Sequence, residues 1–438
     1  MSPLSLNLRS KFKDLRSFIC KIPEVFRTSK MMREIAFLFL LISPQVAYSK
    51  TFATSGFINF SAASRNQDST FEQQNLPDDL TKNRLNNPQS IGNDSQIFLK
   101  FAKEAPDGLK YGITAKTEFN FNSDGRNENP NLDQIFTFAE SDFGKLELGN
   151  NQAVNQKMKS GPTRFARGAG GINGKYLEQV NLPMLSGSGL APHFILLAQS
   201  PIGHGGYAKS FYRPDSSQYS GANRSQFRAL KDDSFDGVED ATKLSYYSPR
   251  ISGLQLGTSY APNSANIGVT KQVMRDVNPT SIKDIFSLGA NYSEDFDNLG
   301  VEISATAEKG KVKNSHADLS AYDLGTSLSY FGFTIGGSYG SWGSSLQPTS
   351  GSYTNQGGAT YNTFGIAYEF GPVSTSVTSL KSSFQKNNYS AISFGVDYKL
   401  TRSLMPYFEL TKFSFNPSSQ GSLGNQGYVF LVGALYSF

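Results

Sequence analysis

The chain has 438 residues, of which 38% are hydrophobic, and its formal net charge at pH 7 is +5. No stretch reaches the roughly 18–20 consecutive apolar residues of a membrane-spanning helix, so a helical membrane protein is excluded. The positive excess lies in residues 1–49, which hold eight basic and three acidic residues. Without them 33 residues of each sign remain, so nothing points to nucleic-acid binding.

The N-terminus carries the features of a targeting segment. The apolar run Ile35–Ile42 follows basic residues and precedes Ala47-Tyr48-Ser49, which has the small-x-small pattern of a cleavage site. Residues 1–49 are therefore predicted to be a leader and secretory signal peptide, because the apolar run is too short to span a membrane. The sequence leaves open which methionine starts translation, Met1, Met31 or Met32.

Beyond the leader, apolar and polar residues alternate with period two in segments of about the 9–11 residues that a tilted membrane-spanning strand requires. The class is all-β, and the expected strands are 54–63, 95–103, 109–120, 132–140, 145–149, 242–247, 254–260, 285–293, 301–309, 321–330, 333–342, 360–370, 373–381, 390–400, 404–413 and 427–438. Short and long connections alternate throughout, which is typical of an antiparallel up-and-down barrel with short periplasmic turns.

The last strand shows what the barrel is expected to face. One face carries Tyr428 and Tyr436 around aliphatic residues and ends on Phe438, as in a strand that crosses hydrocarbon with its rings at the interfaces. The pairs Tyr322/Tyr330 and Tyr361/Tyr368 are read in the same way. Periodicity alone also fits a soluble barrel with an apolar interior, but the signal peptide, the strand number and the aromatic ends favour the membrane. About sixteen strands leave a water-filled lumen.

At this point the chain resembles the Gram-negative general porins, and the alphaproteobacterial type in particular. The resemblance rests on 143–149 (Phe-Gly-Lys-Leu-Glu-Leu-Gly), 243–249 (Lys-Leu-Ser-Tyr-Tyr-Ser-Pro), 253–255 (Gly-Leu-Gln) and the terminal Phe438. It implies a homotrimer in the bacterial outer membrane, in contact with lipids and lipopolysaccharide, that lets ions and small hydrophilic solutes diffuse. It also implies a third long loop folded into the lumen, and insertion by the barrel assembly machinery through a signal that includes Tyr436 and Phe438.

The segment 150–241 is the longest connection and is expected to be an insertion packed inside or above the pore. Two stretches within it, 176–183 and 193–200, would raise the strand number to eighteen, but the second is apolar on both faces. The first part of the segment is basic, whereas general porins usually carry acids on this loop. We therefore expect a weak preference for anions, with Arg164, Arg167 and Lys175 at the constriction.

Four further charges are expected on the wall that faces the lumen: Lys100, Lys116, Glu118 and Glu147. The alternative is that the loop's charges are solvated or bind lipopolysaccharide phosphates. Only charges at the narrowest point matter, since their field decays within about 8 Å at physiological salt.

Reaction chemistry has little support in the sequence. The glycine-rich stretch 168–175 lacks the Gly and Ser/Thr of a phosphate-binding loop, and no His or carboxylate spacing suggests a metal site. The three histidines, His193, His204 and His316, lie outside the expected strands, and the acids in 232–240 read as a solvated run rather than a calcium site. Cys20 is lost with the leader, so no cofactor, thiol chemistry or disulfide is expected.

The sequence thus predicts a passive porin and no enzyme. The alternative is a structural or adhesive outer-membrane barrel whose pore is blocked by 150–241.

Overall fold

A computed structural model describes residues 49–72, 87–119, 131–181, 241–264, 282–312, 317–345, 349, 358–384, 386–418 and 424–438. All of the expected leader except its last residue, Ser49, therefore lies outside the described residues, as do 193–200, all three histidines and the acids of 232–240. The barrel belongs to one compact unit, Lys50–Phe438.

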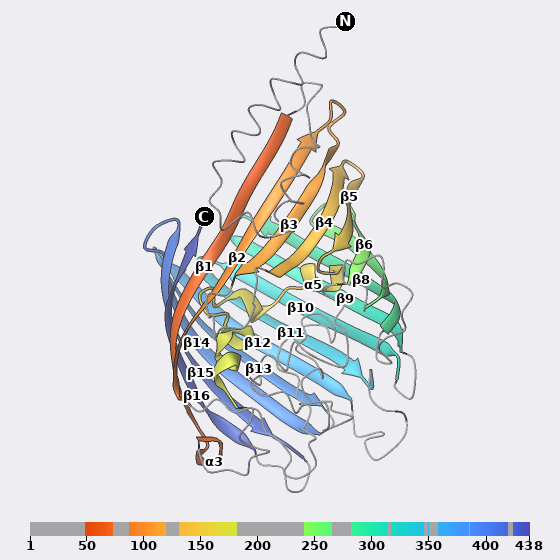
Figure 1. The fold of residues 1–438 in the computed structure, drawn as a ribbon. Coiled ribbons are helices and arrows are strands. Elements are labelled where there is room, and N and C mark those ends of the chain that lie inside the picture. The colour runs from red at the N-terminus through yellow and green to blue at the C-terminus, as the bar shows by residue number, and fades with distance from the viewer. Residues whose placement is uncertain are drawn as a thin grey trace, which may run out of the picture. The chain divides into compact units, whose positions relative to one another are not determined.

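Sixteen strands in the described part of the chain form a closed antiparallel barrel in which each strand pairs with its sequence neighbours (Figure 1). They are β1 (Ser49–Gln67), β2 (Gln89–Glu104), β3 (Lys110–Phe119), β4 (Asn131–Ser141), β5 (Gly144–Asn150), β6 (Thr242–Tyr247), β7 (Leu254–Asn263), β8 (Ile282–Phe296), β9 (Leu299–Val312), β10 (Leu319–Tyr330), β11 (Phe333–Gly343), β12 (Ala359–Phe370), β13 (Val373–Phe384), β14 (Asn387–Tyr398), β15 (Leu404–Asn416) and β16 (Asn425–Ser437). The predicted fold class is confirmed.

The described helices are short, and none is long and apolar enough to cross a membrane. They are α3 (Ser69–Glu72), α5 (Val154–Lys157) and the 3₁₀ turns η2 (Pro162–Arg164), η3 (Gly171–Asn173) and η4 (Lys175–Gln179). Because η4 covers residues 176–179, the additional strand considered at 176–183 is wrong for the residues described there, 176–181.

The barrel closes where the first strand meets the last. β1 pairs with β16 from Phe57 opposite Ser437 to Gln67 opposite Gly427. Gly56 and Phe438 extend the seam by exchanging two backbone hydrogen bonds of 3.0 and 3.1 Å. Closure matters because an open edge would leave unpaired backbone groups in hydrocarbon.

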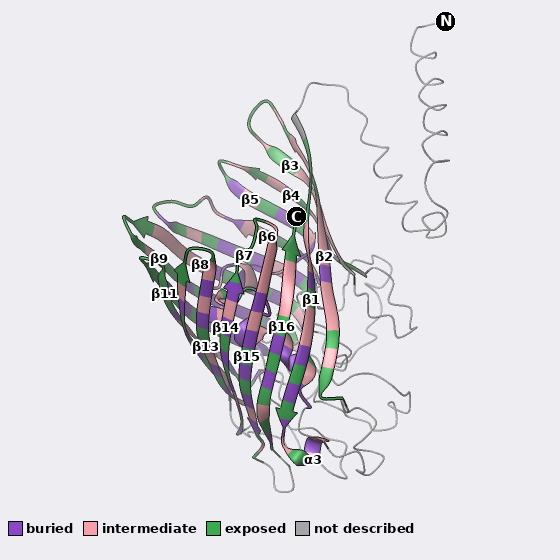
Figure 2. Ribbon diagram, turned by 90° about the vertical axis from the view of Figure 1, so that its left-hand side faces the viewer, coloured by how far each residue is buried: buried purple, intermediate pink, exposed green. Residues whose placement is uncertain are grey.

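Exposed and buried residues alternate along the strands, and Figure 2 shows this as bands of colour. In β10, Leu324 and Leu328 are exposed, whereas Asp323 and Ser327 are buried. The outward face of the barrel is therefore apolar and the inward face largely polar, which is the arrangement of a barrel in a bilayer.

Two details of the sequence reading are wrong. Tyr361 is buried inside the barrel rather than at an interface, because Tyr361 and Tyr368 are seven residues apart and so face opposite sides. The connection between β13 and β14 is also not long: only residues 385 and 386 separate the strands, with Lys386 at φ 65°. Short and long connections thus do not alternate strictly.

We expect an arginine on the outward face to destabilise the barrel. Leu324→Arg, near the middle of β10, should cost about 2–4 kcal/mol in the free energy of unfolding, because the charge enters hydrocarbon. Thr114→Arg on the inward face of β3 is the control and should cost less than about 1 kcal/mol. Urea unfolding in lipid vesicles measures both, and equal costs would contradict the assignment of faces.

Candidate constriction site inside the barrel

Residues 151–181, which follow β5, run along the inner face of the wall. α5 packs on β7, β8 and β9, η2 on β11 and β12, η3 on β13, β14 and β15, and η4 on β16. In Figure 1 this segment lies within the ring of strands. We call residues 151–181 the inner loop.

Glycines on the inward face make room for the inner loop. A Cβ on Gly325 of β10 would lie 2.1 Å from the carbonyl oxygen of Ser160, and one on Gly365 of β12 would lie 2.5 Å from Pro162 Cβ. A Cβ at three more inward glycines would also come close to side chains of the loop; they are Gly257, Gly289 and Gly395. The backbone of the loop can approach the strands this closely because these positions carry no side chain.

Basic residues of the inner loop pair with acids of the wall. Lys157 Nζ lies 2.6 Å from Glu147 on β5, and Lys159 Nζ lies 3.2 Å from Asp323 on β10. Two more pairs follow along the chain, Arg167 with Glu369 and Lys175 with Asp94. The four pairs are spread around the circumference, so they fix the course of the loop.

Two further wall carboxylates bind the loop's backbone. Asp397 accepts hydrogen bonds of 3.0 Å from the N–H groups of both Arg167 and Gly168. Glu409 accepts one of 2.8 Å from Gly171. The glycine-rich stretch therefore does bind anions, but those anions are carboxylates of the same chain.

Burial affects the lysines of the loop. It lowers the pKa of Lys157, although the attraction of Glu147 acts in the opposite direction. It also lowers the pKa of Lys159, whose charge Asp323 favours. Lys159 additionally donates to the hydroxyl of Tyr361 at 2.6 Å. These ammonium groups serve to hold the loop rather than to attract ions from solution.

Apolar side chains hold the second half of the inner loop. Ile172, Tyr176 and Leu177 are at most 1% exposed and belong to one cluster with inward-facing residues of the wall, among them Phe413 and Leu431. The hydroxyl of Tyr176 also contacts that of Tyr389. On the side of β13–β16, much of the inner face is thus apolar and covered by the loop. The strand pattern had suggested that water lines this face.

The inward face of β2 and β3 is less covered. Lys100 is exposed and Thr114 is half-buried, whereas Ser376 and Thr411, on the side that carries the loop, are 4% and 0% exposed. Water therefore reaches these side chains on the β2–β3 side. The start of β2 contacts the loop, because Asp94 pairs with Lys175. We call the inward face of β3, and of β2 beyond Asp94, the open arc.

The expected constriction residues behave differently from one another. Arg164 is exposed and pairs with no acid in the described part of the chain. Arg167 and Lys175 are held by Glu369 and Asp94, so their charges are compensated. Of the three expected cations, Arg164 alone is uncompensated within the described residues.

The pairing of β2 with β3 places the expected wall charges of these strands on the inward face. Lys100 lies opposite Thr114, and Lys116 and Glu118 lie two and four residues further along that face of β3. The side chain of Glu118 lies outside the described residues. Glu147 is 2% exposed and is bound by two lysines, Lys145 and Lys157, so it adds no free charge to the lumen.

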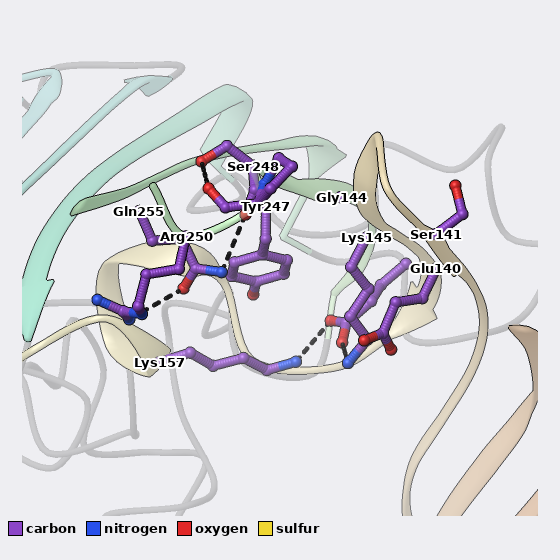
Figure 3. A pocket seen from close by; sticks show the side chains of 11 residues that line it. Glu140, Ser141, Gly144, Lys145, Lys157, Tyr247, Ser248, Arg250 and Gln255 are labelled. Atoms are coloured by element: carbon purple, nitrogen blue, oxygen red, sulfur yellow. Dashed lines mark hydrogen bonds and ion pairs between the residues drawn. The ribbon is translucent and has the colours of Figure 1, made fainter. Parts of the chain in front are cut away.

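A cavity of about 370 Å³ opens at the end of the barrel that carries the short turns (Figure 3). It is lined by Glu140 and Lys145 from the β4–β5 hairpin, Lys157 from α5, and Tyr247 and Arg250 from the end of β6 and the turn after it. Within the described residues, no three His, Cys, Asp or Glu side chains lie close enough to hold a metal ion.

Several of the residues that position the loop were not singled out from the sequence. On their predicted strands, Asp323, Asp397 and Glu409 all fall on the alternating positions that face the lumen. That placement could have identified them as inward-facing acids. Their partners are remote in sequence, so no local pattern joins them to the loop.

Gly325→Ala should displace the loop, because its Cβ collides with the carbonyl of Ser160. Overpacking of this kind costs about 1–3 kcal/mol. We expect trypsin to cleave faster after Lys157 and Lys159 in this variant, and mass spectrometry of the digest measures the rate. Gly337→Ala on the outward face is the matched control, and cleavage at the same rate in both variants would show that the loop does not rest on this glycine.

Comparisons with known proteins agree with this architecture. The family model for Gram-negative porins matches residues 38–418. The chain is 29% identical over 335 residues to an uncharacterized protein of Rickettsia felis, covering 63% of this chain and 68% of that protein. It is 27% identical over 409 residues to one of Rickettsia bellii, covering 82% and 85%.

Solved structures share the fold. A triple mutant of the Rhodopseudomonas blastica porin gives a TM-score of 0.51 at 13% identity, and the anion-selective porin from Comamonas acidovorans gives 0.54 at 15%. Each alignment covers 89% of this chain and 100% of the other. We conclude that the chain belongs to the Gram-negative porin family and is an outer-membrane β-barrel that forms a porin channel.

Proposed function

We propose that this porin passes ions and small hydrophilic solutes along the open arc with a weak preference for anions. The observation that carries the proposal is the exposed guanidinium group of Arg164 on the inner loop, which pairs with no acid in the part of the chain that the structure describes. Lys100 on β2 adds a second cation that pairs with no acid among the residues described. It lies 4.9 Å from the ring centroid of Phe138.

The preference is weak because most other charges of the site cancel. Glu147 and Asp323 are neutralised by loop lysines, and Arg167 and Lys175 by wall acids. A single exposed charge attracts a counter-ion at 4 Å by only about 1 kcal/mol in water. The anion-selective porin from Comamonas acidovorans has the same fold, but at 15% identity it supports the fold alone.

Three partners follow from this role. We propose a homotrimer, contact with outer-membrane lipids and lipopolysaccharide, and insertion by the barrel assembly machinery. Tyr436 is exposed on the outward face of β16, and Phe438 ends the seam with β1. Both are thus available at one end of the last strand. The channel performs no reaction and needs no cofactor.

The second candidate is a structural or adhesive barrel whose lumen is blocked by residues 150–241. The apolar cluster between the inner loop and the wall favours it, because that side of the lumen is filled. The half-buried and exposed residues of the open arc favour the channel instead. A properly folded barrel without conductance would establish the blocked candidate.

Arg164→Glu should shift ion selectivity toward cations. In a planar bilayer under a potassium chloride gradient, we expect the zero-current potential of the natural protein to indicate anion preference. The variant should lower the chloride-to-potassium permeability ratio by up to about fivefold, which corresponds to about 1 kcal/mol.

Arg402→Glu, in the turn between β14 and β15, is the control for a charge change away from the loop and should leave the ratio nearly unchanged. Cation preference in the natural protein, or an equal response of both variants, would contradict the assignment of Arg164 to the constriction.

A further inference from the structure

The cavity at the turn end of the barrel contains a buried polar atom without a partner. Tyr247 is 7% exposed, and its hydroxyl makes no hydrogen bond with any residue that the structure describes. Figure 3 shows its ring between Arg250 on one side and Lys145 and Glu140 on the other. A buried hydroxyl normally has a hydrogen-bond partner, so this atom is suited to bind something that enters the cavity.

Only some of the charged residues that line the cavity form ion pairs with one another. Glu147 is bound by Lys145 at 2.7 Å and by Lys157 at 2.6 Å. Arg250, in contrast, donates to neutral groups such as the Asn291 side chain, at 2.9 Å, and pairs with no acid among the described residues. Glu140 is exposed and has no cationic partner there either. Arg250 and Glu140 are therefore the two charged groups of the lining that form no ion pair among the described residues. Lys145 and Lys157 share the one carboxylate of Glu147, so the lining carries one net positive charge.

The two uncompensated groups come from different hairpins, with Tyr247 between them. A small molecule with a carboxylate at one end and an ammonium group nearby can satisfy all three. Its carboxylate would accept from Arg250 and from the Tyr247 hydroxyl, and its ammonium group would donate to Glu140. The volume of about 370 Å³ lies at the small end of the roughly 300–1,000 Å³ range of ligand pockets.

The lining of the cavity is largely polar. Tyr247 supplies its one aromatic ring, and Lys157 Nζ lies 5.7 Å from the centroid of that ring. A lining with charges of both signs is suited to a small zwitterion rather than to a simple ion.

We infer that this cavity is a low-affinity binding site for free amino acids at the periplasmic mouth of the channel. The mouth is assigned from the short turns, which face the periplasm in such barrels. The inference rests on the proposed open path, because a solute must reach the cavity and leave it.

Three compounds that share a phenyl group separate the contributions of charge. L-phenylalanine is a zwitterion, 3-phenylpropionate is an anion and 2-phenylethylamine is a cation. Each is added to the side of a planar bilayer that faces the short turns, and the concentration that halves single-channel potassium chloride conductance is measured. We expect L-phenylalanine to block at roughly a tenth of the concentration that either single-charge compound requires.

Tyr247→Phe should raise the half-blocking concentration of L-phenylalanine by roughly two- to tenfold, since one hydrogen bond is lost. Tyr246→Phe is the matched control, because Tyr246 is its neighbour on the outward face and donates to the Phe143 carbonyl. Glu140→Gln should weaken block by L-phenylalanine and leave block by 3-phenylpropionate unchanged.

Equal block by all three compounds, stronger block by 3-phenylpropionate, or unchanged block in Tyr247→Phe would overturn the inference. If none of the three compounds blocks a channel of normal potassium chloride conductance, the binding site is wrong and the channel function stands. If the protein shows no conductance before any compound is added, the open channel itself is contradicted.

Discussion

Inward-facing carboxylates are the groups on which the arrangement inside this barrel depends. Glu147, Asp323, Asp397 and Glu409 are all at most 4% exposed. Burying a carboxylate without a partner is costly, and one segment of the chain supplies the partners for all four. Lysine ammonium groups serve the first two, and backbone N–H groups serve the others. The inner loop is therefore held by charge at successive points along the wall.

Packing determines which side of the lumen the loop occupies. Inward glycines from β7 to β14 allow its backbone to lie directly on the strands, and an apolar cluster secures its second half. The remaining inward surface, the open arc of β2 and β3, keeps its polar side chains accessible. Because the docking charges cancel in pairs, we propose that ion selectivity depends on Arg164 and Lys100, which pair with no acid among the described residues.

Much of the fold was predictable, because each strand carries its own period-two pattern. The outward face of β16 could be read from Tyr428 and Tyr436 alone. The site was less predictable. A count of loop charges treated Arg167 and Lys175 as free, whereas their partners, Glu369 and Asp94, are remote in sequence and become neighbours only when the barrel closes. The inward position of Tyr361 was predictable, since a spacing of seven residues along a strand places Tyr361 and Tyr368 on opposite faces.

The inner loop covers one side of the lumen and leaves the open arc accessible, and labelling of single cysteines tests this arrangement most directly. Residues 50–438 contain no cysteine, so single cysteines can be placed at Thr114 in the open arc and at Ser376 beneath the loop. A charged, thiol-reactive methanethiosulfonate is then added while single-channel conductance is recorded. We predict a stepwise change in conductance at position 114 and no change at position 376. Rapid modification at 376, or none at 114, would contradict the account.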